Sequence, residues 1–109
     1  MTEKQIQKTI LDFLNYHPKI AWVERINVGA HVVVDSNSRR FIRYAFKGCS
    51  DVIGQLKSGK LLAIEVKSQK GRLTLHQSEF LKKVNDNGGV ALVVRSVDEL
   101  ENHLNNVEL

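Results

Sequence analysis

The sequence contains little cysteine and proline and no long apolar run. Its single cysteine, Cys49, cannot form an internal disulfide and leaves no cysteine cluster to hold zinc or an iron–sulfur centre. The four histidines show no spacing typical of metal ligands, so we expect no zinc site. No apolar stretch approaches a membrane span, and the chain opens without an apolar secretory segment. A soluble, cytoplasmic protein without a membrane partner is therefore predicted.

The length and composition are those of one compact domain. A chain of 109 residues can bury roughly 65% of the surface that its unfolded form exposes, which leaves little room for a second core. Hydrophobic residues at 42% and charged residues at 26% are ordinary globular values. A single domain over residues 1–109 is therefore predicted.

Positive charge is concentrated in the middle of the chain. The formal net charge is +4, but between Arg39 and Arg72 only two residues, Asp51 and Glu65, are acidic. Such a basic field favours a polyanionic partner such as a nucleic acid, and the two carboxylates inside it need an explanation. The basic residues of this stretch are Arg39, Arg40, Arg43, Lys47, Lys57, Lys60, Lys67, Lys70 and Arg72.

Capping boxes and apolar periodicity predict three helices, over residues 3–16, from residue 74 to a stop at 87–89, and after residue 96. The capping pairs are Thr2 with Gln5, Thr74 with Gln77, and Ser96 with Glu99. Strands are predicted over 21–28, 31–35, 41–46, 51–56, 61–67 and 90–94.

The predicted strands and helices alternate in a way that indicates the fold class. The first three strands, with a turn at 36–38, are expected to form a meander. Residues 61–66 are almost continuously apolar, which is typical of a central strand, and 90–94 is expected to be another buried strand. The order of elements predicts an α/β fold with a mixed β-sheet flanked by helices on both faces.

Glu65 lies in the most apolar predicted strand, where an unpaired ionised carboxylate costs about several kcal/mol. Side chains alternate along a strand, so Glu65 and Lys67 project from the same face, about 6.6 Å apart along the chain. For an isolated Glu-x-Lys, a structural ion pair would be the ordinary reading. Whether Glu65 and Lys67 form such an ion pair or a functional site depends on which residue of the neighbouring strand faces Glu65.

The turn between the strands at 51–56 and 61–67 sets which residues face Glu65. If 57–59 is a three-residue loop with Gly59 in the left-handed region, Asp51 lies directly opposite Glu65. A two-residue turn would shift the register by one and direct Asp51 to the other face. The first register predicts a carboxylate pair that either shares a proton or binds a hard divalent cation.

Mg²⁺ suits such a pair, because it takes oxygen ligands and usually needs one or two carboxylates plus substrate phosphate oxygens. Phosphodiester hydrolysis requires a barrier lowering on the order of 20 kcal/mol, much of which a metal ion can provide. Lys67 would orient or deprotonate the attacking water, or stabilise charge at phosphorus. The surrounding arginines and lysines would contact the nucleic-acid backbone.

Asp51 followed by Glu65-Val66-Lys67 resembles the PD-(D/E)XK nuclease signature, and the whole context resembles the VRR-NUC (virus-type replication-repair nuclease) family. Ser50 stands where that motif usually has proline. The resemblance implies a restriction-endonuclease-like core of α-β-β-β-α-β order with an extra hairpin and a C-terminal helix. The matching segments are Glu3, Arg25-Ile26-Asn27-Val28-Gly29, Gly48-Cys49-Ser50-Asp51, Glu65-Val66-Lys67 and Leu73-Thr74-Leu75-His76-Gln77.

The resemblance also implies roles for individual residues. Asp51 and Glu65, with the backbone carbonyl of Val66, would ligate Mg²⁺ or Mn²⁺, and Lys67 would be the catalytic lysine. Glu3 would reach the metal or its water shell, and Gln77 would contact the site. Cys49 is expected to be a small buried residue and not a nucleophile. The candidate DNA-binding residues are Arg25, Arg39, Arg40, Arg43, Lys47, Lys70 and Arg72.

The implied activity is that of a Mg²⁺-dependent endodeoxyribonuclease. Small stand-alone members of this family resemble four-way-junction resolvases of phages or mobile elements, which implies branched DNA as substrate and a bacterial or phage-infected host cell. A two-fold symmetric homodimer would match the symmetry of a junction, with apolar residues of 31–46 at its interface. The alternative is a nucleic-acid-binding module that keeps the fold but does not cut.

Overall fold

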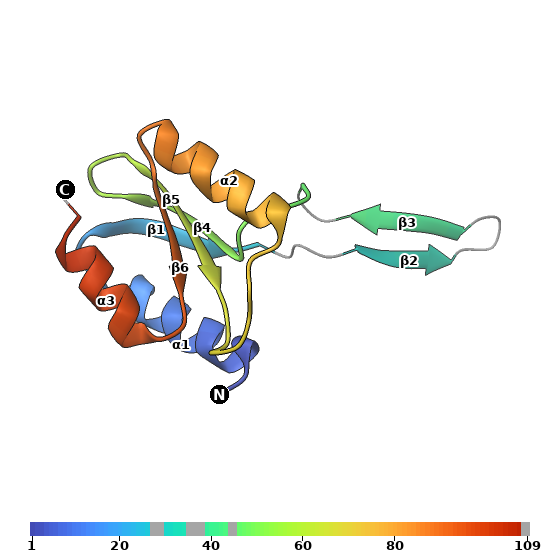
Figure 1. Cartoon of the computed structure of the whole chain (residues 1–109), viewed down its shortest axis with the longest axis horizontal. Coiled ribbons are helices and arrows are strands. Elements are labelled where there is room, and N and C mark those ends of the chain that lie inside the picture. Colours follow the sequence, from blue (N-terminus) through green and yellow to red (C-terminus); the bar gives the residue numbers. More distant parts are fainter. Residues whose placement is uncertain (27–29, 35–38, 44–45, 108–109) are drawn as a thin grey trace.

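The computed structural model describes residues 1–26, 30–34, 39–43 and 46–107, and it has a four-stranded sheet between two layers of helices (Figure 1). Helices α1 and α3 cover one face of this sheet, and α2 covers the other. None of the helices in these described ranges is long and apolar enough to cross a bilayer. The elements are α1 (Glu3–Asn15), β1 (Ile20–Arg25), β2 (Ala30–Val34), β3 (Arg39–Arg43), β4 (Val52–Leu56), β5 (Leu61–Val66), α2 (Leu75–Asp86), β6 (Val90–Val94) and α3 (Val97–Asn105).

The sheet is mixed, with strand order β1-β4-β5-β6. Strands β1, β4 and β5 pair in antiparallel fashion, and β6 lies parallel to β5. The expected meander of the first three strands is wrong, because β1 pairs with β4, while β2 and β3, within the described residues, pair only with each other in a separate hairpin. The reason is burial: Ile20 and Val23 of β1 pack into the same core as Val52 and Leu56 of β4.

Most of the apolar core lies between the sheet and the helices α1 and α3. Alternate residues of β5 fill it, together with the buried residues of the two helices. A smaller cluster under α2 contains Ala63, Leu81 and Val84. Glu65 therefore projects, like Ala63, from the face that α2 covers. The buried residues of the larger core include Ile6, Ile10, Leu14, Leu62, Ile64, Val66, Leu100 and Leu104.

The two outer strands are less buried than the centre. Strand β5 is buried from Leu62 onward, as predicted for a central strand. Strand β6 was expected to be buried as well, but only Val94 is, and residues 90–93 are half-buried. Because β6 has a β-strand neighbour on one side only, the helices leave part of its surface exposed.

The β4–β5 turn has the predicted three-residue form. Gly59 adopts φ +95°, and the Leu56 N–H donates to the Lys60 carbonyl over 2.9 Å. The pairing of Val52 with Ile64, and of Gly54 with Leu62, confirms the register that aligns Asp51 with Glu65. The alternative two-residue turn is thereby excluded.

Two of the three capping boxes form as predicted. Thr2 and Thr74 each accept from the backbone N–H of the glutamine three residues later, and each glutamine side chain accepts in return. Ser96 caps α3 by accepting from the Glu99 N–H, but the Glu99 carboxylate accepts from the Arg95 N–H. Ser96 is more extended, with φ −160° against −73° and −77° at the other caps, so its own N–H is not the partner of the glutamate.

Candidate active site

The loop that precedes Asp51 packs tightly on α2 and so positions Asp51 at the sheet. Gly48 adopts φ +87°, and a side chain there would place its Cβ 2.4 Å from the His76 carbonyl oxygen. Ser50 is fully buried, and its hydroxyl donates to the Val52 carbonyl over 3.0 Å. The serine in the usual proline position thus fixes the backbone on both sides of Asp51 by a hydrogen bond.

The Asp51 carboxylate is held against the central strand. Its Oδ2 accepts from the Val66 N–H over 2.8 Å, and the Asp51 carbonyl accepts from the Ile26 N–H over 2.7 Å. Side chain and backbone are therefore fixed from two neighbouring strands. This places a carboxylate beside Glu65, as the predicted register requires.

Glu65 is the most constrained charged residue of the site. It is 2% exposed, and its Oε1 accepts from Gln77 Nε2 over 3.1 Å. The second oxygen, Oε2, is buried and has no hydrogen-bond partner among the described residues. The pKa of Glu65 is raised to about 8, mainly by burial and also by the negative charge of Asp51, while Lys67 opposes the shift. The Glu65 carboxyl group therefore keeps its proton to a higher pH than an exposed glutamate does.

Lys67 completes the cluster from the end of β5. Its Nζ lies 3.8 Å from Glu65 Oε1, and the residue is 9% exposed. Its backbone N–H donates to the Val94 carbonyl over 3.0 Å, so β6 fixes the main chain at this point. Two carboxylates and one ammonium share this site. With both carboxylates ionised, the cluster lacks one positive charge, which a proton or a metal ion would supply.

Glu3 lies near Lys67 but does not join the two carboxylates. A Cβ added at Gly71 would lie 3.0 Å from Glu3 Oε2 and 3.4 Å from Lys67 Cβ, so both side chains border the same glycine. Over the described ranges, no group of three or more histidine, cysteine, aspartate and glutamate side chains is gathered for a metal ion. The structure thus brings Asp51, Glu65, Lys67 and Gln77 together, with Glu3 at the margin.

The candidate DNA-binding residues fall into two groups. Lys70 and Arg72 line a basic concavity of about 680 Å³ beside the loop after β5, and Arg25 and Lys47 are exposed on segments close to Asp51 in sequence or pairing. The others, Arg39, Arg40 and Arg43, belong to β3 of the separate hairpin. Sequence reasoning missed Arg95, which lines the same concavity as Lys70 and Arg72.

Cys49 is buried, as predicted, with 4% of its surface exposed. Burial raises the pKa of its thiol, and the charge of Glu65 raises it further. A thiol kept protonated in this way is a poor nucleophile.

The mixed four-stranded sheet flanked by helices is consistent with a restriction-endonuclease-like fold, and Asp51, just before β4, lies beside Glu65 of β5 in it. The family model of the VRR-NUC domain matches residues 1–98. The chain therefore belongs to the VRR-NUC family and is a nuclease domain, a hydrolase with DNA as its substrate. Nuclease domains of this type generally use divalent metal ions. No curated protein matches the chain.

Proposed function

We propose that this protein is a Mg²⁺- or Mn²⁺-dependent DNA endonuclease whose metal is held by Asp51, Glu65 and the backbone carbonyl of Val66. The observation that supports this proposal is the buried Glu65 Oε2, which lacks a hydrogen-bond partner in the described part of the chain and lies in a site that holds two carboxyl groups and one ammonium group. Hard divalent cations prefer carboxylate and carbonyl oxygens. The residues present therefore fit the metal that the family implies.

The side chains around the carboxylate pair have complementary roles in this proposal. When bound, the cation supplies Lewis acidity toward a phosphate oxygen and makes water a stronger acid. Gln77 donates to Glu65 Oε1 and so leaves Oε2 available, while the Val66 N–H orients Asp51. Lys67 orients the attacking water or stabilises negative charge at phosphorus. Glu3 acts from the margin, on the water shell.

The basic residues bind the DNA backbone without reading its sequence. Lys70 and Arg72 line the concavity beside the loop that follows Lys67, which suits a phosphate near the cleaved bond. Arg39, Arg40 and Arg43 contact DNA at a distance from the site, through the hairpin. The same surface charge would serve a binding module that does not cut, and cleavage itself separates the two functions.

The preferred substrate in this proposal is branched DNA, cut by a homodimer. A domain of this size offers one active site, whereas a four-way junction must be cut on two strands to be resolved. A two-fold symmetric dimer supplies two sites in matching orientation. Strands β2 and β3 contact no other helix or strand of the described part, and an isolated two-stranded hairpin is marginally stable in water. The paired Val32 and Phe41 support this hairpin as the dimer interface.

A cleavage assay tests the proposed activity. A labelled four-way junction and a linear duplex of the same sequence are incubated with the protein in Mg²⁺, Mn²⁺, Ca²⁺ or EDTA. We expect paired incisions of the junction in Mg²⁺ or Mn²⁺ and none in EDTA. Tight junction binding with no incision under any condition would instead identify a non-cutting module.

Light scattering tests the proposed dimer. At micromolar concentration the mass should be about twice the 12.4 kDa of one chain. Phe41→Ser should lower that mass toward one chain if the hairpin forms the interface. A strictly monomeric protein that still makes paired incisions would refute the dimer.

A further inference from the structure

Arg95 occupies a position beside the site that the proposed chemistry does not use. It follows directly after β6, whose last residue, Val94, pairs with Val66 of β5. The Lys67 N–H donates to the Val94 carbonyl, so the chain segments leaving β5 and β6 start side by side. Lys67 and Arg95 are thus neighbours at one edge of the sheet.

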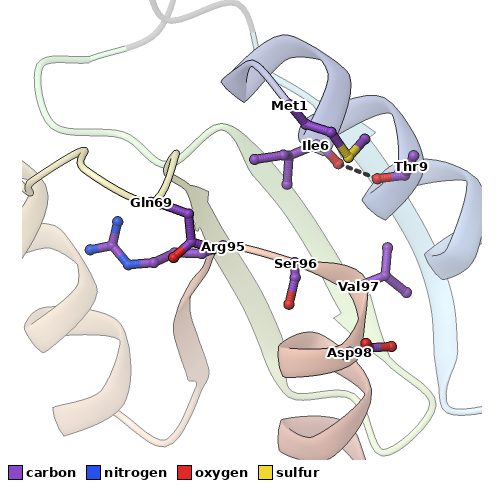
Figure 2. Close-up of a pocket in the computed structure, with 8 residues that line it drawn as sticks. All are labelled: Met1, Ile6, Thr9, Gln69, Arg95, Ser96, Val97 and Asp98. Atoms are coloured by element: carbon purple, nitrogen blue, oxygen red, sulfur yellow. Dashed lines mark hydrogen bonds between the residues drawn. The ribbon is translucent and has the colours of Figure 1, made fainter.

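The Arg95 guanidinium holds the loop that follows Lys67. Its Nη1 donates both to the Ser68 carbonyl and to the Gly71 carbonyl, the latter over 2.8 Å. The Ser68 carbonyl also accepts from the Gly71 N–H over 3.1 Å, which closes the turn. Figure 2 shows the Arg95 side chain directed away from Ser96 and Val97. One amino group therefore joins both ends of the turn to β6.

One side of this turn borders a cavity. A cavity of about 380 Å³, lined by Ile6, Gln69 and Val97 among others, lies where the loop approaches α1 and the start of α3 (Figure 2). The hydrogen bonds of the half-buried Arg95 join β6 to the turn beside this cavity. Arginine suits this task, because its guanidinium is rigid and always charged and so holds Nη1 in a fixed position.

The 68–71 turn borders the proposed catalytic groups. It begins immediately after Lys67, and Gly71 approaches both Lys67 Cβ and the Glu3 carboxylate so closely that an added Cβ would crowd them. We propose that Arg95 is a positioning residue, which fixes the 68–71 turn and through it the side chains of Lys67 and Glu3. This inference rests on the proposed nuclease activity, since it assigns Arg95 a part in that site.

The decisive variant is Arg95→Lys, which keeps the charge but replaces the rigid guanidinium that holds Nη1 with a shorter and more flexible side chain; Arg95→Ala removes both the charge and the donor. Hydrogen exchange of the metal-free protein should show the Gly71 amide exchanging about tenfold faster in both variants. Single-turnover cleavage in Mn²⁺ should slow by about 10- to 100-fold, because small displacements of catalytic groups have effects of this size. Binding of uncut DNA in Ca²⁺ should change by less than about threefold in Arg95→Lys. Lys82→Ala, on the exposed side of α2, is the matched control and should change none of these quantities.

The competing explanation is that Arg95 contacts a DNA phosphate directly. In that case Arg95→Lys would cleave normally with unchanged exchange at Gly71, and Arg95→Ala would make the salt dependence of binding shallower by about 0.9 on a log–log scale. Either result overturns the positioning role. If the alanine variant does not fold, the lysine variant decides. If the unaltered protein itself fails to cut, the proposed function is wrong. The exchange rate of the Gly71 amide in the two variants still shows whether Arg95 fixes the 68–71 turn.

Discussion

The β4–β5 site and the β2–β3 hairpin differ in how much of the fold packs around them (Figure 1). At the site, Glu65 and Lys67 are each exposed by less than a tenth, and helices cover both faces of the sheet. The hairpin strands, within the described residues, contact only each other, and β3 contains three arginines. Electrostatic interactions are stronger in the buried site, from which water is excluded. The arginines of the extended hairpin can instead attract a long polyanion such as DNA. We infer that the site sets the rate of cleavage and the hairpin sets DNA affinity.

The largest expected effect comes from removing the buried charges. Lys67→Ala and Glu65→Gln should each lower the cleavage rate by about 10²–10³ or more, because both groups act on the transition state in the proposed mechanism. Binding of junction DNA in Ca²⁺ should stay within about threefold of the unaltered protein. Single-turnover kinetics measure the first quantity and fluorescence anisotropy the second. A variant that cleaves at a near-normal rate would remove its residue from the site.

The metal-free protein should lose stability as the pH rises toward 8. Burial raises the pKa of Glu65 from 4.5 to about 8, so the folded state binds this proton more tightly than the unfolded state. The stabilising contribution is complete below about pH 4.5 and is lost as the pH rises through about 8. Thermal unfolding in EDTA at pH 5, 6.5 and 8 measures the decline.

Two variants isolate the part of that decline that belongs to Glu65. Glu65→Gln should flatten the profile and raise Tm at pH 8, by roughly 4–8 °C for each kcal/mol recovered. Glu24→Gln, at an exposed position on β1, should leave the profile as it was. An equal decline in the Glu65 variant would show that other groups cause it.

Changes in the hairpin should alter binding and not the rate. Arg39→Ala or Arg40→Ala should make the salt dependence of DNA binding shallower by about 0.9 for each lost phosphate contact. The rate at saturating protein should change by less than about twofold. Titrations across a series of salt concentrations measure the slope. If the slope is unchanged, β3 lies outside the DNA footprint. The inference that the hairpin sets DNA affinity is then wrong.

The smallest effect is expected at Cys49. Cys49→Ser keeps the size of a buried side chain whose pKa is raised, so cleavage should change by less than about twofold. A modest loss of thermal stability is expected from burying a hydroxyl. Cleavage rates and a melting curve of the same sample measure both quantities. Loss of activity in a folded serine variant would assign the thiol a part in the chemistry.

Local signals in the sequence were sufficient for part of the fold. Two capping boxes, at Thr2 and Thr74, and the turn at Gly59 depend only on residues a few positions apart. All three have the predicted form. The pairing of β1 with β4 was not predictable in this way, because it joins Arg25 to Val52 across the hairpin. Alternating apolar residues indicate a strand but not its partner, which tertiary packing decides.

The residues of the candidate site also differ in whether the sequence alone could predict them. Asp51, Glu65 and Lys67 follow from a buried acidic residue and a predictable turn, and Gln77 follows from the family resemblance, with its contact to Glu65 found in the structure. Arg95 left no signal, because its partners are backbone carbonyls of a loop, and any residue type supplies those.

The most direct test of the account is metal binding at the carboxylate pair. Mn²⁺ titration followed by calorimetry, at pH 8 and without DNA, compares the unaltered protein with Asp51→Asn, Glu65→Gln and the control Glu101→Gln. We predict that Asp51→Asn and Glu65→Gln each weaken binding by about tenfold or more, because each replaces a charged oxygen ligand, while the control binds as the unaltered protein does. Equal Mn²⁺ affinity in all four proteins would contradict the central claim that Asp51 and Glu65 hold the metal.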